Sequence, residues 1–193
     1  MKLIRTLKKI VFHIKFRKAN SFQKAEMMRP YFYHLGKNVR LFTSHFGGNP
    51  EHISIGDNVL VAADVKFITH DMSVFNIARY AGVSESSVDG IGSIVLGDNC
   101  FIGAYSLLMP NCSVGRNSVI AAGSIVTKHV PDNEVWGGVP ASFIMTCDDY
   151  AKKVIERSSH YPWLWTKKTM SEQDRIRSRQ EYLFGQKTTE IEL

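Results

Sequence analysis

The chain has 193 residues, enough for one domain with a sizeable core and short additions at its ends. With 44% hydrophobic and 22% charged residues it resembles an ordinary soluble protein, and no stretch of about 18 apolar residues is present to span a bilayer. The net charge of +6 concentrates at the two ends of the chain without any nucleic-acid-binding motif, so we expect no nucleic-acid partner.

Residues 1–18 predict a basic amphipathic helix. Apolar side chains, among them Leu3, Leu7, Ile10 and Ile14, recur at helical spacing and alternate with lysine and arginine. Such a helix can bury its apolar face in an anionic membrane surface, so peripheral membrane contact is one expectation. The more frequent alternative is a helix that packs on its own or a neighbouring subunit. Charges interrupt every apolar run and no small-residue cleavage site follows, which excludes a typical signal peptide.

A repeat of six residues organises the middle of the chain. Every sixth position of its most regular part carries a bulky aliphatic side chain: Leu96, Ile102, Leu108, Val114, Ile120 and Val126. A helix repeats its apolar positions every three or four residues and a single strand every two, so the interval fits neither. It is the interval of a β-solenoid, in which each hexapeptide forms a short strand and a corner and stacked coils bury a shared core. Similar hexads begin at Leu35 and resume at Ile55.

Small and conformationally tolerant residues occupy the remaining positions of the repeat. Small residues stand two positions before five of the aliphatic residues: Cys100, Ser106, Cys112, Ser118 and Ser124. Residues that tolerate the left-handed backbone of a tight corner stand three positions after four of the aliphatic residues: Asn99, Asn111, Asn117 and Gly123. Because two of the three cysteines fall at interior positions, we expect free thiols and a reducing cytoplasm.

One large interruption breaks the repeat between Phe67 and Leu96. The inserted loop, about residues 70–93, opens with Thr69-His70-Asp71, and insertions in solenoids leave at corners and often form the binding face. His70 follows Phe67 by three residues, which is a corner position and suits a catalytic group. The alternative for any single histidine is a structural role with satisfied hydrogen bonds.

The predicted organisation has three parts. An N-terminal helical segment covers residues 1–34, the solenoid covers 35–145, and a charged, aromatic helical extension covers 146–193.

Several motifs in the solenoid resemble those of the hexapeptide-repeat acyltransferases, and within that family the sugar O-acetyltransferases similar to maltose and galactoside acetyltransferases. They are Ile55-Gly-Asp-Asn, Thr69-His70, Leu96-Gly-Asp-Asn-Cys-Phe-Ile-Gly, residues 118–128 and Gly138-Val-Pro-Ala. Phe46-Gly47-Gly48-Asn49-Pro50 and Phe67-Ile68-Thr69-His70-Asp71 resemble the branch that acetylates capsular, exopolysaccharide or lipopolysaccharide sugars. The resemblance implies a mainly β fold, a left-handed parallel β-helix, that forms a homotrimer with acetyl-CoA in a groove between two subunits.

The same resemblance assigns roles to individual residues. It implies that His70 is the general base that deprotonates a sugar hydroxyl, which suits imidazole because it ordinarily titrates near neutral pH. A carboxylate should orient the imidazole, and Asp71, Glu85 and Asp89 remain the candidates. Asp71 is equally a candidate for contact with the sugar, and Asn49 is expected on the acceptor side unless it only forms a solenoid-edge loop.

The cofactor residues also follow from the resemblance. Acetyl-CoA is expected to lie along four residues of the later coils: Ala104, Ala122, Thr127 and Lys128. Lys128 suits a phosphate as a point charge. The small residues would occur at corners for packing alone, and both explanations can hold together.

Two other classes of function remain as alternatives. A metal-dependent hydratase similar to γ-type carbonic anhydrase would need three histidine ligands, but the next histidine after His70 is His129, so we expect no metal. A non-catalytic scaffold or polysaccharide-binding solenoid would use the same coils without acetyl-CoA.

Overall fold

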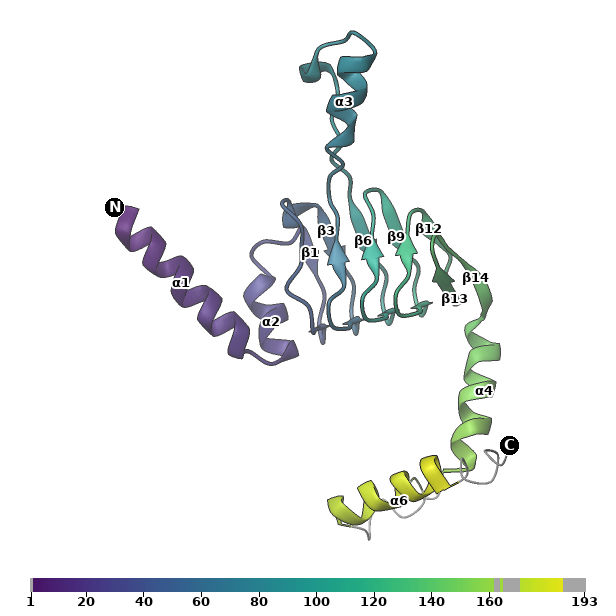
Figure 1. The fold of residues 1–193 in the computed structure, drawn as a ribbon. Coiled ribbons are helices and arrows are strands. Elements are labelled where there is room, and N and C mark those ends of the chain that lie inside the picture. Colours follow the sequence, from purple (N-terminus) through teal and green to yellow (C-terminus); the bar gives the residue numbers. More distant parts are fainter. Residues whose placement is uncertain (1, 162–163, 165–170, 186–193) are drawn as a thin grey trace, which may run out of the picture. The chain divides into compact units, whose positions relative to one another are not determined.

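The structure is a computed structural model that describes residues 2–161, 164 and 171–185 (Figure 1). It divides into two compact units, Met1–Cys147 and Asp148–Leu193. The first unit holds the solenoid and the second holds only helices among its described residues. No described helix is both long enough and apolar enough to cross a membrane.

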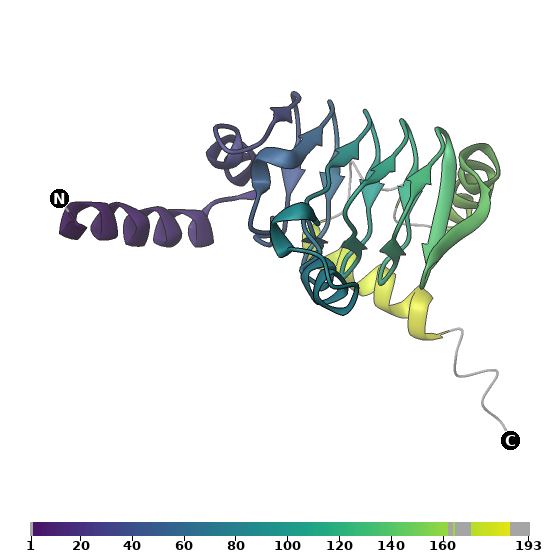
Figure 2. The same ribbon diagram turned by 90° about the horizontal axis from the view of Figure 1, so that it is seen from above.

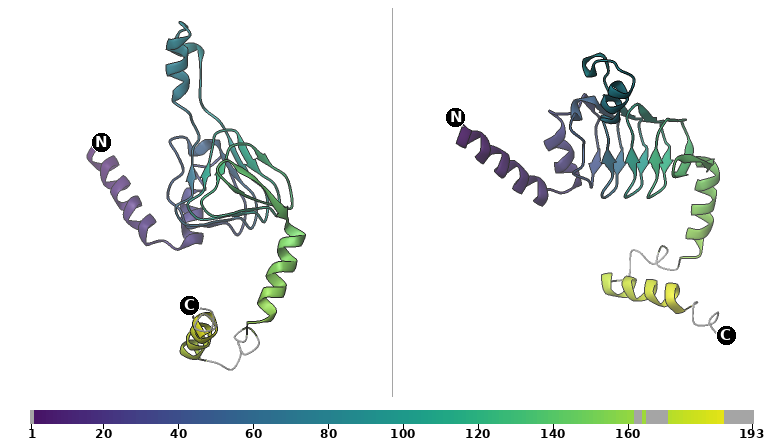
Figure 3. Two further views of the ribbon diagram at one scale, coloured as in Figure 1. Left: turned by 45° about the vertical axis from the view of Figure 1, so that its right-hand side comes forward. Right: turned by 45° about the horizontal axis from the view of Figure 1, so that its top comes forward.

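The first unit is built on a parallel β-helix with three sheets. Figure 2 shows the coils stacked side by side, and the left view of Figure 3 shows their three-sided outline. The first sheet contains β1 (His34–Leu35), β3 (Ile53–Ile55), β6 (Ile94–Leu96), β9 (Cys112–Val114) and β12 (His129–Val130). The second contains β2 (Arg40–Leu41), β4 (Leu60–Val61), β7 (Phe101–Ile102), β10 (Val119–Ile120), β13 (Glu134–Gly138) and β14 (Ala141–Thr146). The third contains β5 (Lys66–Phe67), β8 (Leu107–Leu108) and β11 (Ile125–Val126).

The register of the sheets explains the interval of six. In the most regular part of the solenoid three hexads complete one coil, so Leu96, Ile102 and Leu108 each pair with the residue 18 positions later. Leu96 pairs with Val114, and Ile102 pairs with Ile120 on the neighbouring sheet. These side chains point inward and are buried, and together they form the core along the axis of the solenoid. The repeat predicted from the sequence is therefore confirmed.

The corners adopt the left-handed backbone that the sequence predicts. Successive corner positions have φ near +60°, at Asn99, Tyr105, Asn111, Asn117 and Gly123. A left-handed residue thus occurs at every corner of this part of the solenoid. Tyr105 shows that one of these corners accommodates a bulky side chain.

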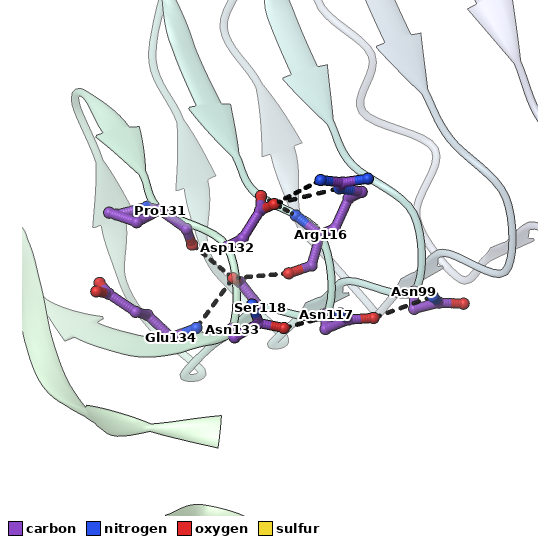
Figure 4. A network of polar contacts seen from close by, with 8 residues as sticks. All are labelled: Asn99, Arg116, Asn117, Ser118, Pro131, Asp132, Asn133 and Glu134. Carbon is purple, nitrogen blue, oxygen red and sulfur yellow. Dashed lines mark hydrogen bonds and ion pairs between the residues drawn. The ribbon is translucent and has the colours of Figure 1, made fainter. Parts of the chain in front are cut away.

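One corner carries a ladder of asparagine side chains, formed by Asn38, Asn58, Asn99, Asn117 and Asn133. The amide nitrogen of each donates to the side-chain oxygen of the next over 2.8–3.0 Å. Figure 4 shows the last three members of the ladder, Asn99, Asn117 and Asn133. The ladder runs along the corner between the first and second sheets. It therefore links each coil to the next at this corner.

A buried serine beside the ladder shows why small polar residues suit the repeat. The hydroxyl of Ser118 donates to the Pro131 carbonyl over 2.7 Å and accepts from the Glu134 amide over 3.2 Å (Figure 4). Its polar atom is therefore satisfied although the residue is fully buried. At the same corner, Arg116 and Asp132 of neighbouring coils form an ion pair at 3.1 Å. The hydrogen bond from the Arg116 backbone is the main cause that lowers the pKa of Asp132.

Two helices precede the solenoid, and an aromatic cluster packs at its N-terminal end. Helix α1 spans Lys2–Lys18 and α2 spans Ser21–Met28, which begins with a capping box between Asn20 and Gln23. Phe46 lies at the centre of the cluster, with ring centroids 6.4 Å from Phe16, 5.2 Å from Phe32 and 5.7 Å from Phe67.

The inserted loop leaves the solenoid between β5 and β6 (Figure 1). It contains helix α3 (Ser73–Tyr80) and the 3-10 helix η2 (Glu85–Ser87), and a second 3-10 helix, η1 (Pro50–His52), precedes β3. Large apolar side chains on the insertion are exposed, including Met72, Ile77 and Tyr80.

The second unit contains α4 (Cys147–Ser159), whose first residue belongs to the solenoid unit, and α6 (Glu172–Gly185). Both termini of the chain therefore carry helices, as expected.

Candidate active site

His70 lies at the corner between the third and first sheets, where the insertion begins. Strand β5 ends at Phe67, and the backbone of His70 then pairs with Ile91 in an antiparallel bridge. Two hydrogen bonds of 2.8 Å flank the bridge, from Asp71 N to Gly90 O and from Gly92 N to Thr69 O. The two ends of the insertion are thereby joined, which fixes the position of His70 against the rigid coil.

The imidazole has an unused polar atom in a confined place. His70 is half-buried, and its Nδ1 is buried without a hydrogen-bond partner among the described residues. The neighbouring hydroxyl of Thr69 is in the same state. Buried polar atoms normally have hydrogen-bond partners. A bound molecule or a neighbouring subunit could supply the missing partners of these two atoms.

A glycine loop lies against these two side chains. Gly47 adopts a φ of +69°, and a Cβ added there would come within 2.9 Å of Thr69 Oγ1. A Cβ on Gly48 would lie 3.1 Å from His70 Cε1 and 3.6 Å from its Nδ1. In the Phe46-Gly47-Gly48-Asn49 loop, the absence of side chains at Gly47 and Gly48 therefore makes room for Thr69 and the His70 ring.

Replacing Gly48 with alanine should lower kcat by about tenfold, because the added Cβ pushes the His70 ring a few tenths of an ångström from its position. Backbone strain should not contribute, since Gly48 is not in the left-handed region. Steady-state kinetics of the acetyl transfer that the sequence leads us to expect would measure the effect. Gly48→Val should show a larger loss, and the unfolding midpoints should stay close to that of the parent protein. Equal kcat in all three proteins would contradict the contact.

The three carboxylates proposed to orient His70 bind elsewhere. Asp71 accepts a hydrogen bond from the Ser73 amide over 2.9 Å at the start of α3, and hydrogen bonding from Ser73 lowers its pKa. Glu85 pairs with Arg79 at 2.6 Å, within the insertion. Asp89 accepts from the Ile91 amide over 3.0 Å. None of the three is thus bonded to His70 in the described part of the chain.

The expected acetyl-CoA residues flank the third sheet. Ala104 and Ala122 lie on neighbouring coils at the corner that precedes this sheet, where the Gly123 amide donates to the Ala104 carbonyl over 2.8 Å. Thr127 and Lys128 follow β11 at the opposite corner, which is also the edge that carries His70. Strands β5 and β11 are two strand spacings apart, so His70 and Thr127 belong to coils roughly 10 Å apart.

Lys128 already has one aromatic neighbour. Its ammonium lies 5.3 Å from the ring centroid of Trp136, and the Trp136 indole donates to Glu134 over 2.6 Å. The lysine side chain is exposed, so this cation–π contact holds the charge at the solenoid surface. The contact was not predicted, because Trp136 lies on the next coil and no local spacing relates the two residues.

A surface groove begins close to the glycine loop. Asn49 Nδ2 donates to Glu51 Oε1 over 3.3 Å, and hydrogen bonds from its own backbone and from Asn49 lower the pKa of Glu51. The groove has a volume of about 380 Å³ on the outer side of the first sheet, and its lining is Tyr33, Glu51, His52, Ser54, Ser93 and Val95. Sequence reasoning missed this groove, since its lining comes from three separate segments of the chain.

The described residues contain no candidate metal site. No group of three histidine, cysteine, aspartate or glutamate side chains there is arranged to hold an ion.

Comparison with known proteins identifies several relatives. Residues 93–128 match the family described as bacterial transferase hexapeptide (six repeats). The chain is 33% identical to "Protein CapG" of Staphylococcus aureus, over 61% of this chain and 66% of that protein. It is 31% identical to a galactoside O-acetyltransferase of Escherichia coli, over 68% of this chain and 62% of the relative. The chain thus spans slightly less than two thirds of these curated relatives.

Solved structures bear on the fold. A hexapeptide-repeat acetyltransferase from Vibrio cholerae matches with a TM-score of 0.53 at 22% identity, covering 75% of this chain and 91% of that one. A galactoside acetyltransferase in complex with coenzyme A also matches with a TM-score of 0.53 at 22% identity, covering 76% and 82%. The expected fold class, a left-handed parallel β-helix with helices at both ends, is confirmed.

Proposed function

Because the chain belongs to the hexapeptide-repeat transferases, we propose that it transfers an acetyl group from acetyl-CoA to a hydroxyl group of a sugar. The observation that carries the proposal is the half-buried His70 imidazole, with an unpartnered nitrogen at the corner where the insertion begins. A galactoside O-acetyltransferase among the relatives, and a solved galactoside acetyltransferase that binds coenzyme A, support the choice of reaction and donor.

In the proposed reaction His70 acts as the general base. A sugar hydroxyl is far too weak an acid to ionise at pH 7, so a base must accept its proton as the oxygen attacks the thioester carbonyl. The new C–O bond forms, the C–S bond breaks, and the proton held by the imidazole passes to the leaving CoA sulfur. The products are an O-acetyl sugar and CoA with a free thiol, and the attack is direct, without an acyl-enzyme.

Acetyl-CoA is proposed to lie along the third sheet. Ala104 and Ala122 present small side chains at one edge, which leaves room for the pantetheine arm. Thr127 and Lys128 lie at the other edge, and the exposed Lys128 ammonium suits a phosphate. We propose a homotrimer in which a neighbouring subunit supplies the second wall of this groove, and the unpartnered Nδ1 of His70 supports a site that one chain leaves incomplete.

The acceptor is proposed to enter from the first sheet. Asn49 ends the glycine loop and Asp71 follows His70 in the chain. The groove of Tyr33, His52 and Ser93 also includes Glu51, to which Asn49 donates a hydrogen bond. An exposed tyrosine ring beside two serine hydroxyls and one carboxylate suits a sugar, which has both apolar ring faces and hydrogen-bonding edges. A role in capsular, exopolysaccharide or lipopolysaccharide synthesis is the finer proposal and rests on the motifs around Phe46 and Phe67.

We place the reaction in the cytoplasm. Cys100 and Cys112 are buried free thiols, and burial raises the pKa of both to about 12. Buried unpaired thiols are typical of a reducing compartment.

The purified protein should release free thiol from acetyl-CoA only when a suitable sugar is present. A panel of sugars and nucleotide sugars, assayed with a thiol reagent and by mass spectrometry of the acceptor, tests this. A reaction without acceptor is the control. Saturable acetyl-CoA binding without transfer to any sugar would contradict the acceptor class, and no saturable binding would favour a non-catalytic scaffold. Zinc-dependent CO₂ hydration would favour the hydratase instead.

A further inference from the structure

Helix α1 has apolar side chains on two opposite sides. A helix turns by about 100° per residue, so Ile10, Val11 and Ile14 share one side while Phe12 and Phe16 share the other. Phe16 is buried, and its ring stacks on Phe12 with a centroid distance of 5.8 Å. The aliphatic side is different, because Ile10, Val11 and Ile14 are 49%, 48% and 52% exposed.

The aromatic side attaches α1 to the solenoid. Phe16 meets Phe46 edge-on at 6.4 Å, and Phe12 meets Tyr31 at 6.0 Å. Packing within the chain therefore accounts for one apolar side of α1 and leaves the aliphatic side uncovered.

A groove continues the aliphatic side between α1 and α2. Its volume is about 740 Å³, and Ile14, Ala19, Phe22 and Met27 contribute its apolar lining. Phe22 is itself exposed. Glu26 is the only acidic residue that lines it, and its carboxylate is paired with Arg29 at 2.7 Å. The apolar surface is thus extended by a second helix without an unpaired negative charge.

The charges of α1 are of one sign. The helix contains no aspartate or glutamate. It has seven lysine and arginine residues: Lys2, Arg5, Lys8, Lys9, Lys15, Arg17 and Lys18. The last three complement the negative end of the helix dipole, but cations outside the last turn have no such reason. Lys15 and Lys18 also line the groove beside Ile14.

We propose that the aliphatic side of α1, with the groove it shares with α2, is a docking surface for an anionic lipid bilayer. Ile10, Val11, Ile14 and Phe22 enter the boundary between headgroups and acyl chains, and the lysines meet lipid phosphates. A second copy of the chain fits less well, since pairing two such surfaces would place like charges together. This proposal adds a location to the enzyme and does not depend on its reaction.

The test uses the full chain and sedimentation with vesicles. Vesicles of phosphatidylglycerol and phosphatidylcholine in equal parts should bind the protein, and vesicles of phosphatidylcholine alone should bind it at least about tenfold more weakly. Raising the salt concentration should weaken the binding, because salt screens exposed charges. Equal affinity for both vesicles, or no binding to either, would overturn the proposal.

Matched variants assign the effect to the helix. The double variant Ile10→Asn, Ile14→Asn should weaken vesicle binding by about tenfold or more, and Lys15→Gln with Lys18→Gln should do likewise. Ile155→Asn, at a more exposed aliphatic residue of α4, should bind like the parent. Light scattering without lipid measures the oligomeric state of the same variants. A loss of oligomer in the Ile10, Ile14 variant would contradict the proposal, because the surface would then be a contact between copies of the chain. Turnover on a soluble acceptor should be unchanged, so failure here is distinguishable from failure of the proposed reaction.

Discussion

The His70→Ala variant should lose about a hundredfold or more in kcat for acetyl transfer, because no other group would take the proton from the acceptor hydroxyl. The KM for acetyl-CoA should change little, since the imidazole is proposed to act on the acceptor and on the transition state. Steady-state kinetics with acetyl-CoA and the accepted sugar measure both quantities. The loss would mark His70 as a catalytic group, and the intact KM would separate catalysis from binding.

Controls must show that the loss is chemical. The circular dichroism spectrum and unfolding midpoint of the variant should match the parent, since the His70 backbone is held by the hydrogen bonds of Thr69 and Asp71. His160→Ala, at an exposed histidine of the second unit, should retain full turnover. Undiminished kcat in folded His70→Ala protein would remove this residue from the mechanism.

Replacing Phe67 with alanine should lower the free energy of unfolding by about 3–5 kcal/mol, through lost burial and the cavity that remains. Phe67 is 1% exposed and packs on Phe46, so it joins the third sheet to the aromatic cluster at the end of the solenoid. Chemical denaturation followed by circular dichroism measures the change.

Phe101→Ala is the matched comparison for this stability prediction. Phe101 also lies in a short strand of the solenoid, but it is 37% exposed on the outer side of the second sheet. Its replacement should lower the free energy of unfolding by less than about 1 kcal/mol. Similar losses in both variants would contradict the view that the inward positions of the repeat carry the stability.

The sequence predicts the solenoid well because its signal is repeated. An error at one hexad is corrected by its neighbours, and the pairing of Leu96 with Val114 follows once three hexads are counted as a coil. The insertion has no such repetition. Helix α3 has only eight residues, too few for a helical period to stand out beside the serines that follow it.

The same contrast applies to the candidate site. A count of hexads placed His70 at a corner, and the structure has the insertion begin there. The direction of a carboxylate is decided by its local turn, so spacing could not foresee that Asp71 would accept a hydrogen bond from the Ser73 amide at the start of α3. The groove of Tyr33, His52 and Ser93 could not be predicted from the sequence either, since three coils must stack before these residues meet.

The asparagine ladder also gives the solenoid an electrical direction. Every bond of the ladder runs the same way, from the amide nitrogen of Asn38 toward Asn58 and finally from Asn117 to Asn133. The small dipoles of the five amides therefore add along the axis. A turn of 18 residues could be duplicated or deleted during evolution while each remaining amide still met a partner of the right polarity, so the length of this protein can change without redesign of that edge.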